Sequence, residues 1–232
     1  MALLNVHGRW VNTDKPGGSV FFVGGGTVAF GGIGASDSNS GLRPEQPLAT
    51  IAQGMTQCTA GRGDTVVLLP GSVTITAAIA ITKADVTLQG YTCTGPNTRN
   101  PSLIVCATNT VIMLDIDAPN VTIKDLTLDH NSTTAAVALI DVGGTTASPD
   151  LLLQNLFIDM EGSGTTTDAI NIQGDTVSTG VVIEGCTIHD FDQDGIIMEA
   201  GSDETVIRNC RIYDGVTANE GRYGISSVSD GS

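Results

Sequence analysis

Aromatic residues are scarce in this sequence. They make up 4% of its 232 residues, with one Trp, three Tyr and five Phe. Sugar-binding sites normally combine flat aromatic side chains with clustered polar groups, so a long saccharide groove is not expected. Basic residues are also few, with 10 Lys and Arg against 25 Asp and Glu and a formal net charge of -15. Nucleic acids and anionic membranes are bound through cations on the protein, so neither is expected as a partner.

Long hydrophobic runs are absent as well. No segment approaches the roughly 18 consecutive apolar residues of a membrane-spanning helix, and residues 1–24 lack the pattern of a secretory signal. We therefore expect synthesis in a host cytoplasm. The five cysteines are an odd number, which fits reduced thiols better than a disulfide framework. Their spacing matches no zinc pattern, and we expect no metal and no cofactor.

The chain does contain one short block that is repeated at intervals of roughly 24 to 35 residues, the range of solenoid repeats. Four clear copies follow one looser copy. They begin at Val121, Leu151, Val181 and Thr205, and the looser copy begins at Val86. A fixed block with a variable spacer is typical of stacked repeats rather than of a two-layer domain.

Each block predicts two short strands joined by a corner. Apolar residues alternate with polar ones, which is the periodicity of a strand and not of a helix. One position interrupts the alternation in every copy, and its residue types tolerate left-handed backbone geometry. These corner residues are Gly90, Asp125, Asn155, Gly185 and Asn209.

A third short strand is predicted after each of the four clear blocks. These strands are Ala136–Leu139, Ala169–Ile172, Gly195–Met198 and Gly224–Ser227. Three short strands per repeat, with equivalent residues in register, describe one coil of a parallel β-helix whose coils stack about 4.8 Å apart. Cys186 and Cys210 would then stack inside the core as small buried hydrophobes, the alternative being a bond or a metal pair.

The block with its Asn or Gly corner resembles the right-handed parallel β-helix of the pectate-lyase-like superfamily. The resemblance extends upstream to an acidic loop, a helix start and a strand, at Asp37–Gly41, Pro47–Ile51 and Gly63–Gly71. It implies an all-β solenoid with a short N-terminal capping helix. It implies little about activity, because this fold carries lyases, glycosidases and structural shafts.

We divide the chain into an N-terminal arm, residues 1–34, and a β-helix, residues 35–232. Residues 35–71 form the entry with the capping helix, and residues 72–232 form the coils. The helix is expected within Pro47–Thr59, with Pro47 in its first turn, where it would close the open end of the β-helix.

The arm either docks on a partner or caps the first coil. It holds the single Trp of the chain and an apolar run between glycine clusters. The candidate docking residues are Trp10, Phe21 and Phe22.

Residue parity predicts an apolar stripe on the outside of the β-helix. Leu152, Val182 and Val206 would point outward from the first strand of three successive coils. Such a stripe is a candidate subunit interface unless a long loop covers it. Three-fold shafts are what the resemblance implies most often among virus proteins, so the expected partner is a homotrimer.

The clearest acidic group precedes the third strand. Asp168 and Asp194 hold matching positions in neighbouring coils, and Asp192 lies nearby. Such carboxylates could hold calcium or form the acid and base pair of a glycosidase, but Asp is also an ordinary residue at a turn. These three are the candidate catalytic residues if the protein is an enzyme.

The outer faces of the other strands offer less for catalysis. The third strands are predicted to expose one carboxylate, which is too little for paired acid and base chemistry. Their predicted outward residues are Ala138, Asn171, Ile197, Ser226, Ile140, Gln173 and Glu199. The second strands end in a column of Asp129, Asp159, His189 and Tyr213, where stacked like charges cost energy unless they are solvated or bind an ion.

Our leading hypothesis from the sequence is a non-catalytic structural protein of a bacteriophage virion, such as a capsid decoration protein, a spike or a fibre shaft. Its partners would be copies of itself and other virion proteins such as a capsid protein. The viral part rests on analogy between folds. The alternatives are a polysaccharide lyase or glycoside hydrolase that uses Asp168, Asp192 and Asp194, and a glycan-binding adhesin module.

Overall fold

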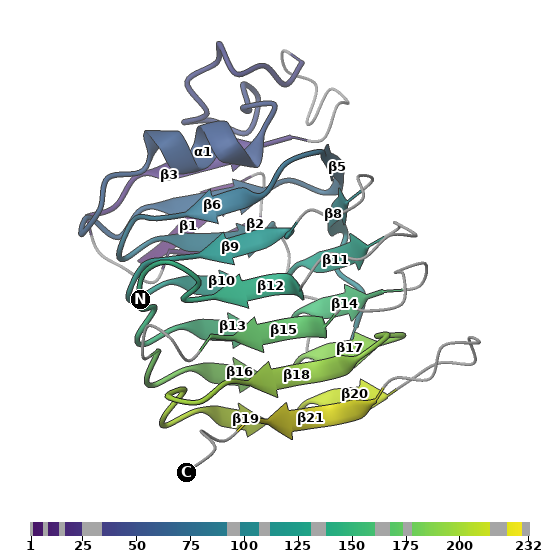
Figure 1. The fold of residues 1–232 in the computed structure, drawn as a ribbon. Helices are drawn as coiled ribbons and strands as arrows, with labels where there is room; N and C mark the ends of the chain where they lie inside the picture. The colour runs from purple at the N-terminus through teal and green to yellow at the C-terminus, as the bar shows by residue number, and fades with distance from the viewer. Residues whose placement is uncertain are drawn as a thin grey trace.

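The chain forms a parallel β-helix in the computed structural model (Figure 1). The structure describes residues 2–6, 9–13, 17–24, 34–91, 98–106, 112–130, 138–160, 168–173, 178–213 and 222–228, and for 2–6 and 9–13 only the backbone. Successive coils stack from the capping helix α1 (Ile51–Gln57) towards the C-terminus. Each coil adds one strand to each of three parallel sheets, here called sheets I, II and III.

Sheet I is made by the first strand of each coil, with one further strand above them. Its strands are β3 (Val20–Val23), β4 (Thr65–Leu68), β7 (Thr87–Gly90), β10 (Thr122–Lys124), β13 (Leu152–Gln154), β16 (Val182–Glu184) and β19 (Val206–Arg208). Sheet II is made by the second strands. They are β5 (Gly71–Ile75), β8 (Ser102–Cys106), β11 (Thr127–His130), β14 (Phe157–Asp159), β17 (Thr187–His189) and β20 (Arg211–Tyr213).

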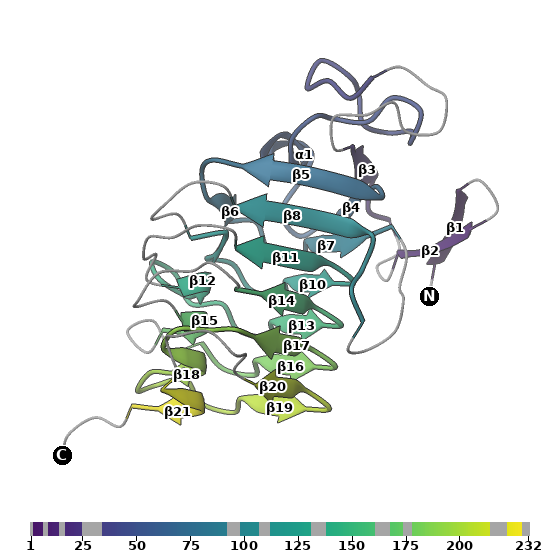
Figure 2. The same cartoon turned by 90° about the vertical axis from the view of Figure 1, so that its right-hand side faces the viewer.

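Sheet III is made by the third strands and faces the viewer in Figure 1. Its strands are β6 (Ile79–Ile81), β9 (Leu114–Ile116), β12 (Ala138–Val142), β15 (Asp168–Ile172), β18 (Asp194–Met198) and β21 (Tyr223–Ser227). Two further strands, β1 (Ala2–Val6) and β2 (Arg9–Thr13), form an antiparallel hairpin. Figure 2 shows this hairpin projecting beside sheet I. No helix among the described residues is long and apolar enough to span a membrane.

The corner between sheets I and II is left-handed at four of its five predicted positions. Asp125, Asn155, Gly185 and Asn209 have φ angles of 59°, 52°, 66° and 56°. Asn and Asp tolerate this conformation because their short polar side chains bond locally, and Gly because it lacks a Cβ. Each corner turns the chain within one or two residues.

Gly90 differs from these four corners. It has no positive φ angle. A Cβ atom on Gly90 would lie 1.9 Å from the backbone oxygen of Asp125 in the next coil. Glycine is therefore required here by the close approach of two coils and not by backbone conformation.

A second left-handed corner precedes the strands of sheet I, and the sequence analysis missed it. It lies immediately before the start of each repeated block. Its residues and φ angles are Asp85 (62°), Asn120 (56°), Asp150 (58°), Gly180 (70°) and Glu204 (56°). The signal was the recurrence of Asp, Asn or Gly before the first apolar residue of four of the five blocks.

The inward side chains of all three sheets form one continuous core. The cluster runs from Phe21 to Ile196 and consists almost entirely of aliphatic residues. Cys186 is buried in it and Cys210 packs against it partly buried, as the stacked arrangement predicted, and both are free thiols. The low aromatic content follows from this architecture, since each coil offers only narrow inward positions.

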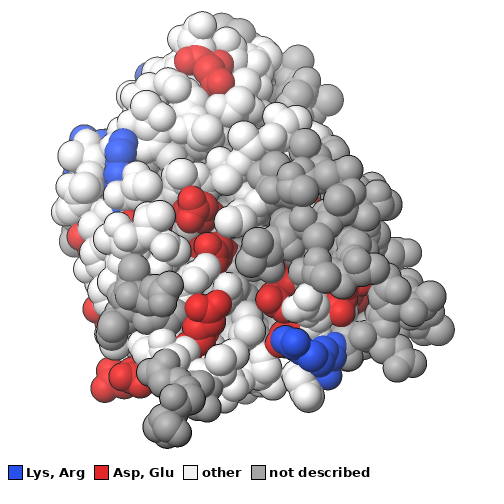
Figure 3. All heavy atoms as spheres, viewed as in Figure 1, with Lys and Arg blue, Asp and Glu red and all other residues white. Residues whose placement is uncertain are grey.

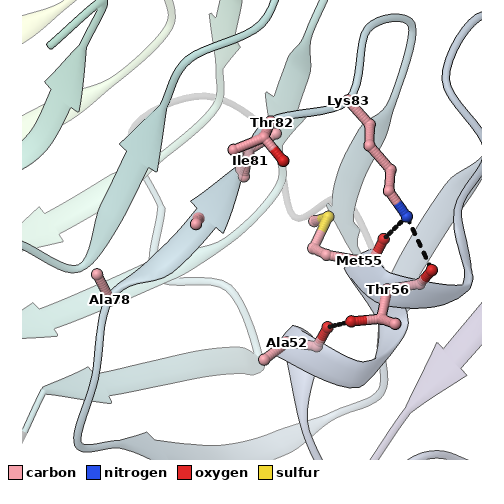
Figure 4. A pocket seen from close by; sticks show the side chains of 8 residues that line it. Ala52, Met55, Thr56, Ala78, Ile81, Thr82 and Lys83 are labelled. Atoms are coloured by element: carbon pink, nitrogen blue, oxygen red, sulfur yellow. Dashed lines mark hydrogen bonds between the residues drawn. The ribbon is translucent and has the colours of Figure 1, made fainter. Parts of the chain in front are cut away.

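Helix α1 closes the first end of the β-helix, as predicted. Its own residues Ile51 and Met55 are buried, and its N-cap Thr50 accepts a hydrogen bond from the backbone N–H of Gln53. Pro47 precedes the helix and is not in its first turn. The Nζ atom of Lys83 donates hydrogen bonds to the carbonyls of Met55, Thr56 and Cys58, at 3.0, 2.8 and 2.6 Å. Figure 4 shows Lys83 at the edge of a groove between α1 and β6, where it satisfies carbonyls at the helix end.

The boundary of the N-terminal arm needs correction. Strand β3 pairs in parallel with β4 and is the outermost strand of sheet I. Phe21 and Phe22 are 5% and 1% exposed, so they are not available as docking residues. Phe21 and Val23 join the main core, whereas Phe22 is buried in a second apolar cluster with Val67, Leu69 and Tyr91. The coils also begin earlier than residue 72, since β4 lies in sheet I.

Candidate functional site

Acidic and amide side chains form a column on the outer face of sheet III. Parallel pairing places Asp115 of β9, Asp141 of β12 and Asn171 of β15 next to one another in consecutive coils. Three further polar residues each come directly after a strand of this sheet. Asp117 follows β9, Gln173 follows β15 and Glu199 follows β18. Figure 3 shows carboxylates gathered down this face of the molecule. We call these six residues the sheet III column.

Part of this column differs from the prediction made from the sequence. Residue parity predicts that Ala138 and Ile140 point outward, whereas both are 0% exposed. The residue that pairs with Asn171 is Asp141, so the predicted alignment was off by three residues. The error arose because β12 was predicted at Ala136–Leu139 and lies at Ala138–Val142.

The column could have been found from a short local pattern. Each strand carries one polar residue between two aliphatic ones, in the segments Leu114–Ile116, Ile140–Val142 and Ile170–Ile172. Aligning these triplets gives the register that the structure has. The result is a row of carboxylates where the sequence analysis expected one.

Hydrogen bonds and burial tune the carboxyl groups of the column. Gln173 Nε2 donates to Asp141 Oδ1 at 2.9 Å, and Asn171 Nδ2 donates to Glu199 Oε1 at 3.3 Å. Burial, together with the neighbouring carboxylates, raises the pKa of Asp141 and of Asp115. Burial also acts on Asp117, but hydrogen bonds from Thr145 and Thr146 outweigh it and lower the pKa of Asp117. The face can accept hydrogen bonds from hydroxyl groups or coordinate a hard cation through oxygen.

Two of the three candidate catalytic residues meet, and a basic residue joins them. The backbone N–H of Asp194 donates to Asp168 Oδ1 at 2.9 Å. The carboxylate of Asp194 is itself 0% exposed. It accepts from Arg222 Nη2 at 2.7 Å and from Ser226 Oγ at 2.6 Å.

These contacts occupy Asp194 fully. Although burial opposes it, the hydrogen bonds from Arg222 and Ser226 lower the pKa of Asp194. An ionised carboxylate that is held by an arginine and closed to solvent is poorly placed to act as a catalytic base. The sequence analysis did not include Arg222, which directly precedes Tyr223, the residue that pairs with Asp194 in the next coil. Asp192, two residues before Asp194 in the sequence, is half-buried.

Asp168 gives the site a pH-dependent stability. Burial raises the pKa of Asp168 from 3.8 to about 6, and the charge of Asp194 adds to the effect. The unfolded chain loses this proton near pH 3.8 and the folded chain near 6, so the contribution of Asp168 to stability is fully present below pH 3.8 and is lost as the pH rises through 6. We expect Asp168→Asn to raise the free energy of unfolding by roughly 2 kcal/mol at pH 7.5, and to change little at pH 3.5.

Urea unfolding at both pH values tests this, with Asp203→Asn at an exposed turn as the control. An equal effect of Asp168→Asn at pH 3.5 and pH 7.5 would contradict the assignment. The amide is expected to keep the hydrogen bond from the N–H of Asp194, so that only the charge is removed.

The predicted apolar stripe is in register on the outer face of sheet I. Leu152 pairs with Val182, and Val182 pairs with Val206. Leu152 and Val182 are half-buried, and Val206 is 45% exposed. Trp10 lies in β2, and its side chain is outside the part of the chain that the structure describes.

Three parallel sheets wound in successive coils define the parallel β-helix class. The family model described as "Right handed beta helix region" matches residues 104–232, which is more than half of the chain. The chain therefore belongs to this family. The predicted all-β right-handed β-helix is thus confirmed.

Two solved structures have a similar fold. A rhamnogalacturonan lyase matches with a TM-score of 0.50 and 16% identity over 90% of this chain and 62% of its own. Pectate lyase Pel9A matches with a TM-score of 0.50 and 15% identity over 89% of this chain and 58% of its own. The chain therefore spans less than two thirds of either structure, and at these identities the likeness shows the fold alone. No curated protein sequence matches the chain.

Proposed function

We propose that this chain is a non-catalytic structural β-helix that associates side by side with copies of itself, as a trimer, in a bacteriophage particle. It would serve there as a decoration protein, a spike or a fibre shaft. The observation that carries the self-association is the apolar column of Leu152, Val182 and Val206 on the outer face of sheet I.

The neighbouring residues of sheet I give this face the composition of an interface. Beside the apolar column runs a polar one that contains Glu184 and Arg208, whose side chains form an ion pair at 2.9 Å. An apolar centre with a polar rim is the usual anatomy of a protein–protein contact. A second β-helix packed against this face would remove the apolar side chains from water.

The hairpin β1–β2 supports an attachment role for the N-terminal residues. In the described part of the chain, β1 and β2 pair only with each other and not with the three sheets. Trp10 lies in this hairpin. We propose that the hairpin, and not Val20–Val23, contacts another virion protein such as a capsid protein.

Replacing Val182 with aspartate tests the sheet I interface. Because the change places a charge in the middle of the apolar column, we expect the trimer to dissociate to monomers without loss of the fold. Light scattering measures the mass, and circular dichroism checks the fold. Thr74→Asp, at an exposed strand position of sheet II, should remain trimeric. A trimer that persists in Val182→Asp would exclude this face as the interface.

The second candidate function is binding or cleavage of a polysaccharide along sheet III. The sheet III column favours it, because several carboxylates and amides lie in adjacent coils of one face. Two solved structures with a similar fold are named as a rhamnogalacturonan lyase and a pectate lyase. Turnover of polygalacturonate or rhamnogalacturonan that is lost in Asp141→Asn, and kept in Asp203→Asn, would favour this function over the structural one. Binding without turnover would favour a glycan-binding adhesin module.

A further inference from the structure

A histidine and two carboxylates converge on the outer face of sheet II, away from the sheet III column. Asp159 ends β14, His189 ends β17 in the next coil, and Asp190 follows directly. Their side chains are 9%, 13% and 15% exposed. One ligand atom from each lies within 4.8 Å of the others.

The ring of His189 is held by aromatic side chains from the coils on both sides. Phe157 meets it edge to face, with centroids 5.1 Å apart. Tyr213 stacks on it with centroids 5.5 Å apart and planes inclined by 7°. The orientation of the imidazole is therefore set by packing before any ligand binds.

Asp190 fixes the protonation of the imidazole. The Nδ1 atom of His189 lies 2.7 Å from Oδ2 of Asp190. An ionised carboxylate can only accept a hydrogen bond, so Nδ1 carries the proton. In the neutral ring the lone pair is then on Nε2. A carboxylate that orients a histidine in this way is a recurring partner of metal-bound imidazole.

The Nε2 atom lies close to a second carboxylate, that of Asp159. It is buried and has no hydrogen-bond partner among the described residues. It lies 3.8 Å from Oδ2 of Asp159, which is too long for a hydrogen bond. Two electron-pair donors thus face each other across a gap. Zn–N and Zn–O bonds are about 2.0–2.2 Å long, so one ion can bridge the two atoms from slightly off the line that joins them.

We propose that Asp159 and His189, with Asp190 as orienting partner or third ligand, form a binding site for a divalent transition-metal ion such as Zn²⁺. The imidazole nitrogen selects against Ca²⁺ and Mg²⁺, which prefer oxygen ligands. The site links two coils of sheet II and would brace them against separation. This proposal departs from the expectation, drawn from cysteine spacing, that the chain binds no metal.

Arg99 competes with the ion for Asp159. Its guanidinium forms an ion pair with Oδ2 of Asp159, and its side chain is 55% exposed. An exposed arginine can move into solvent when the metal binds, since its salt bridge is worth little in water. Removing Arg99 therefore strengthens metal binding, whereas removing a ligand weakens it.

Titration of the full chain with Co²⁺, and displacement by Zn²⁺, tests the site. We expect one ion per chain, a visible cobalt absorption and a higher unfolding temperature with Zn²⁺. His189→Gln and Asp159→Asn should each weaken binding about 100-fold or more, and Asp190→Ala about 10- to 100-fold. Arg99→Ala should bind several-fold more tightly.

Asp203→Asn removes one carboxylate at an exposed turn and serves as the control for net charge, with unchanged affinity expected. Circular dichroism without metal shows whether each variant is folded. If His189→Gln is unfolded, the comparison is made with Asp159→Asn instead. Absence of Co²⁺ binding in the millimolar range would overturn the proposal. Equal affinity in the folded ligand variants and the unmodified chain would place the ion elsewhere and overturn it too.

Discussion

Asp64→Ala is expected to lower the free energy of unfolding by about 3 kcal/mol, because it leaves buried donors without partners. The side chain of Asp64 is 0% exposed and joins three segments at the capped end of the β-helix. Its Oδ1 accepts from the N–H of Ser19 at 2.7 Å and from Arg62 Nε at 2.6 Å. Its Oδ2 accepts from the N–H of Thr59 at 2.6 Å.

The loss should concentrate at the N-terminal end. Ser19 leads into β3 and Thr59 follows α1, so hydrogen exchange in both segments should accelerate. Equilibrium unfolding in urea measures the total effect, and Asp203→Ala, at an exposed turn, is the matched control. A change in Asp64→Ala no larger than that in Asp203→Ala would show that Asp64 does not hold the cap.

The dependence of stability on pH in the acid range also tests the role of Asp64. Burial opposes ionisation, but the hydrogen bonds from Arg62, Thr59 and Ser19 outweigh it and lower the pKa of Asp64 in the folded chain. Its stabilisation is therefore present above the unfolded pKa and is lost as the pH falls through the folded one. Asp64→Ala should lack this part of the acid dependence.

Gly90→Ala is expected to be similarly damaging, by about 3 kcal/mol, for a steric reason. The added methyl group would lie 1.9 Å from the backbone oxygen of Asp125, and a backbone atom cannot turn aside as a side chain can. The two coils would have to separate locally, which breaks the register between β7 and β10.

The control for Gly90→Ala is Gly34→Ala. Gly34 has no heavy atom within 4 Å of its added Cβ and no positive φ angle, so its replacement should be neutral or slightly stabilising. Thermal and urea unfolding of both variants give the comparison. If Gly90→Ala were as stable as Gly34→Ala, the close approach of the two coils would be wrong.

Much of the fold could be predicted because it is local and repeated. Strand alternation and an Asp, Asn or Gly corner recur in the four clear blocks, so the register of these blocks in sheets I and II followed from aligning them. Val182 and His189 were therefore placed next to the correct neighbours. One predicted corner residue, Gly90, is instead the last residue of β7, and the sheet II strand of that coil begins only at Ser102.

The parts that failed depend on contacts between segments far apart in sequence. Strand β3 is separated from β4 by residues 24–64, which include helix α1. The place of β3 in sheet I could therefore not be predicted from a repeat. The spacers before sheet III vary in length, and the alignment of Asp141 was lost across them. The pairing of Arg222 with Asp194 is set by the stacking of coils and has no motif of its own.

The solution mass of the unmodified chain, measured by light scattering over a range of concentrations, tests the proposed self-association most directly. The same measurement should be made on a chain that lacks residues 1–16, a deletion that removes the hairpin β1–β2 and spares β3. A mass three times that of one chain in both forms is the predicted result, and it would place the contact on the β-helix. A monomer in both forms, at all concentrations, would contradict the structural assembly and leave the sheet III column as the face to examine for a ligand.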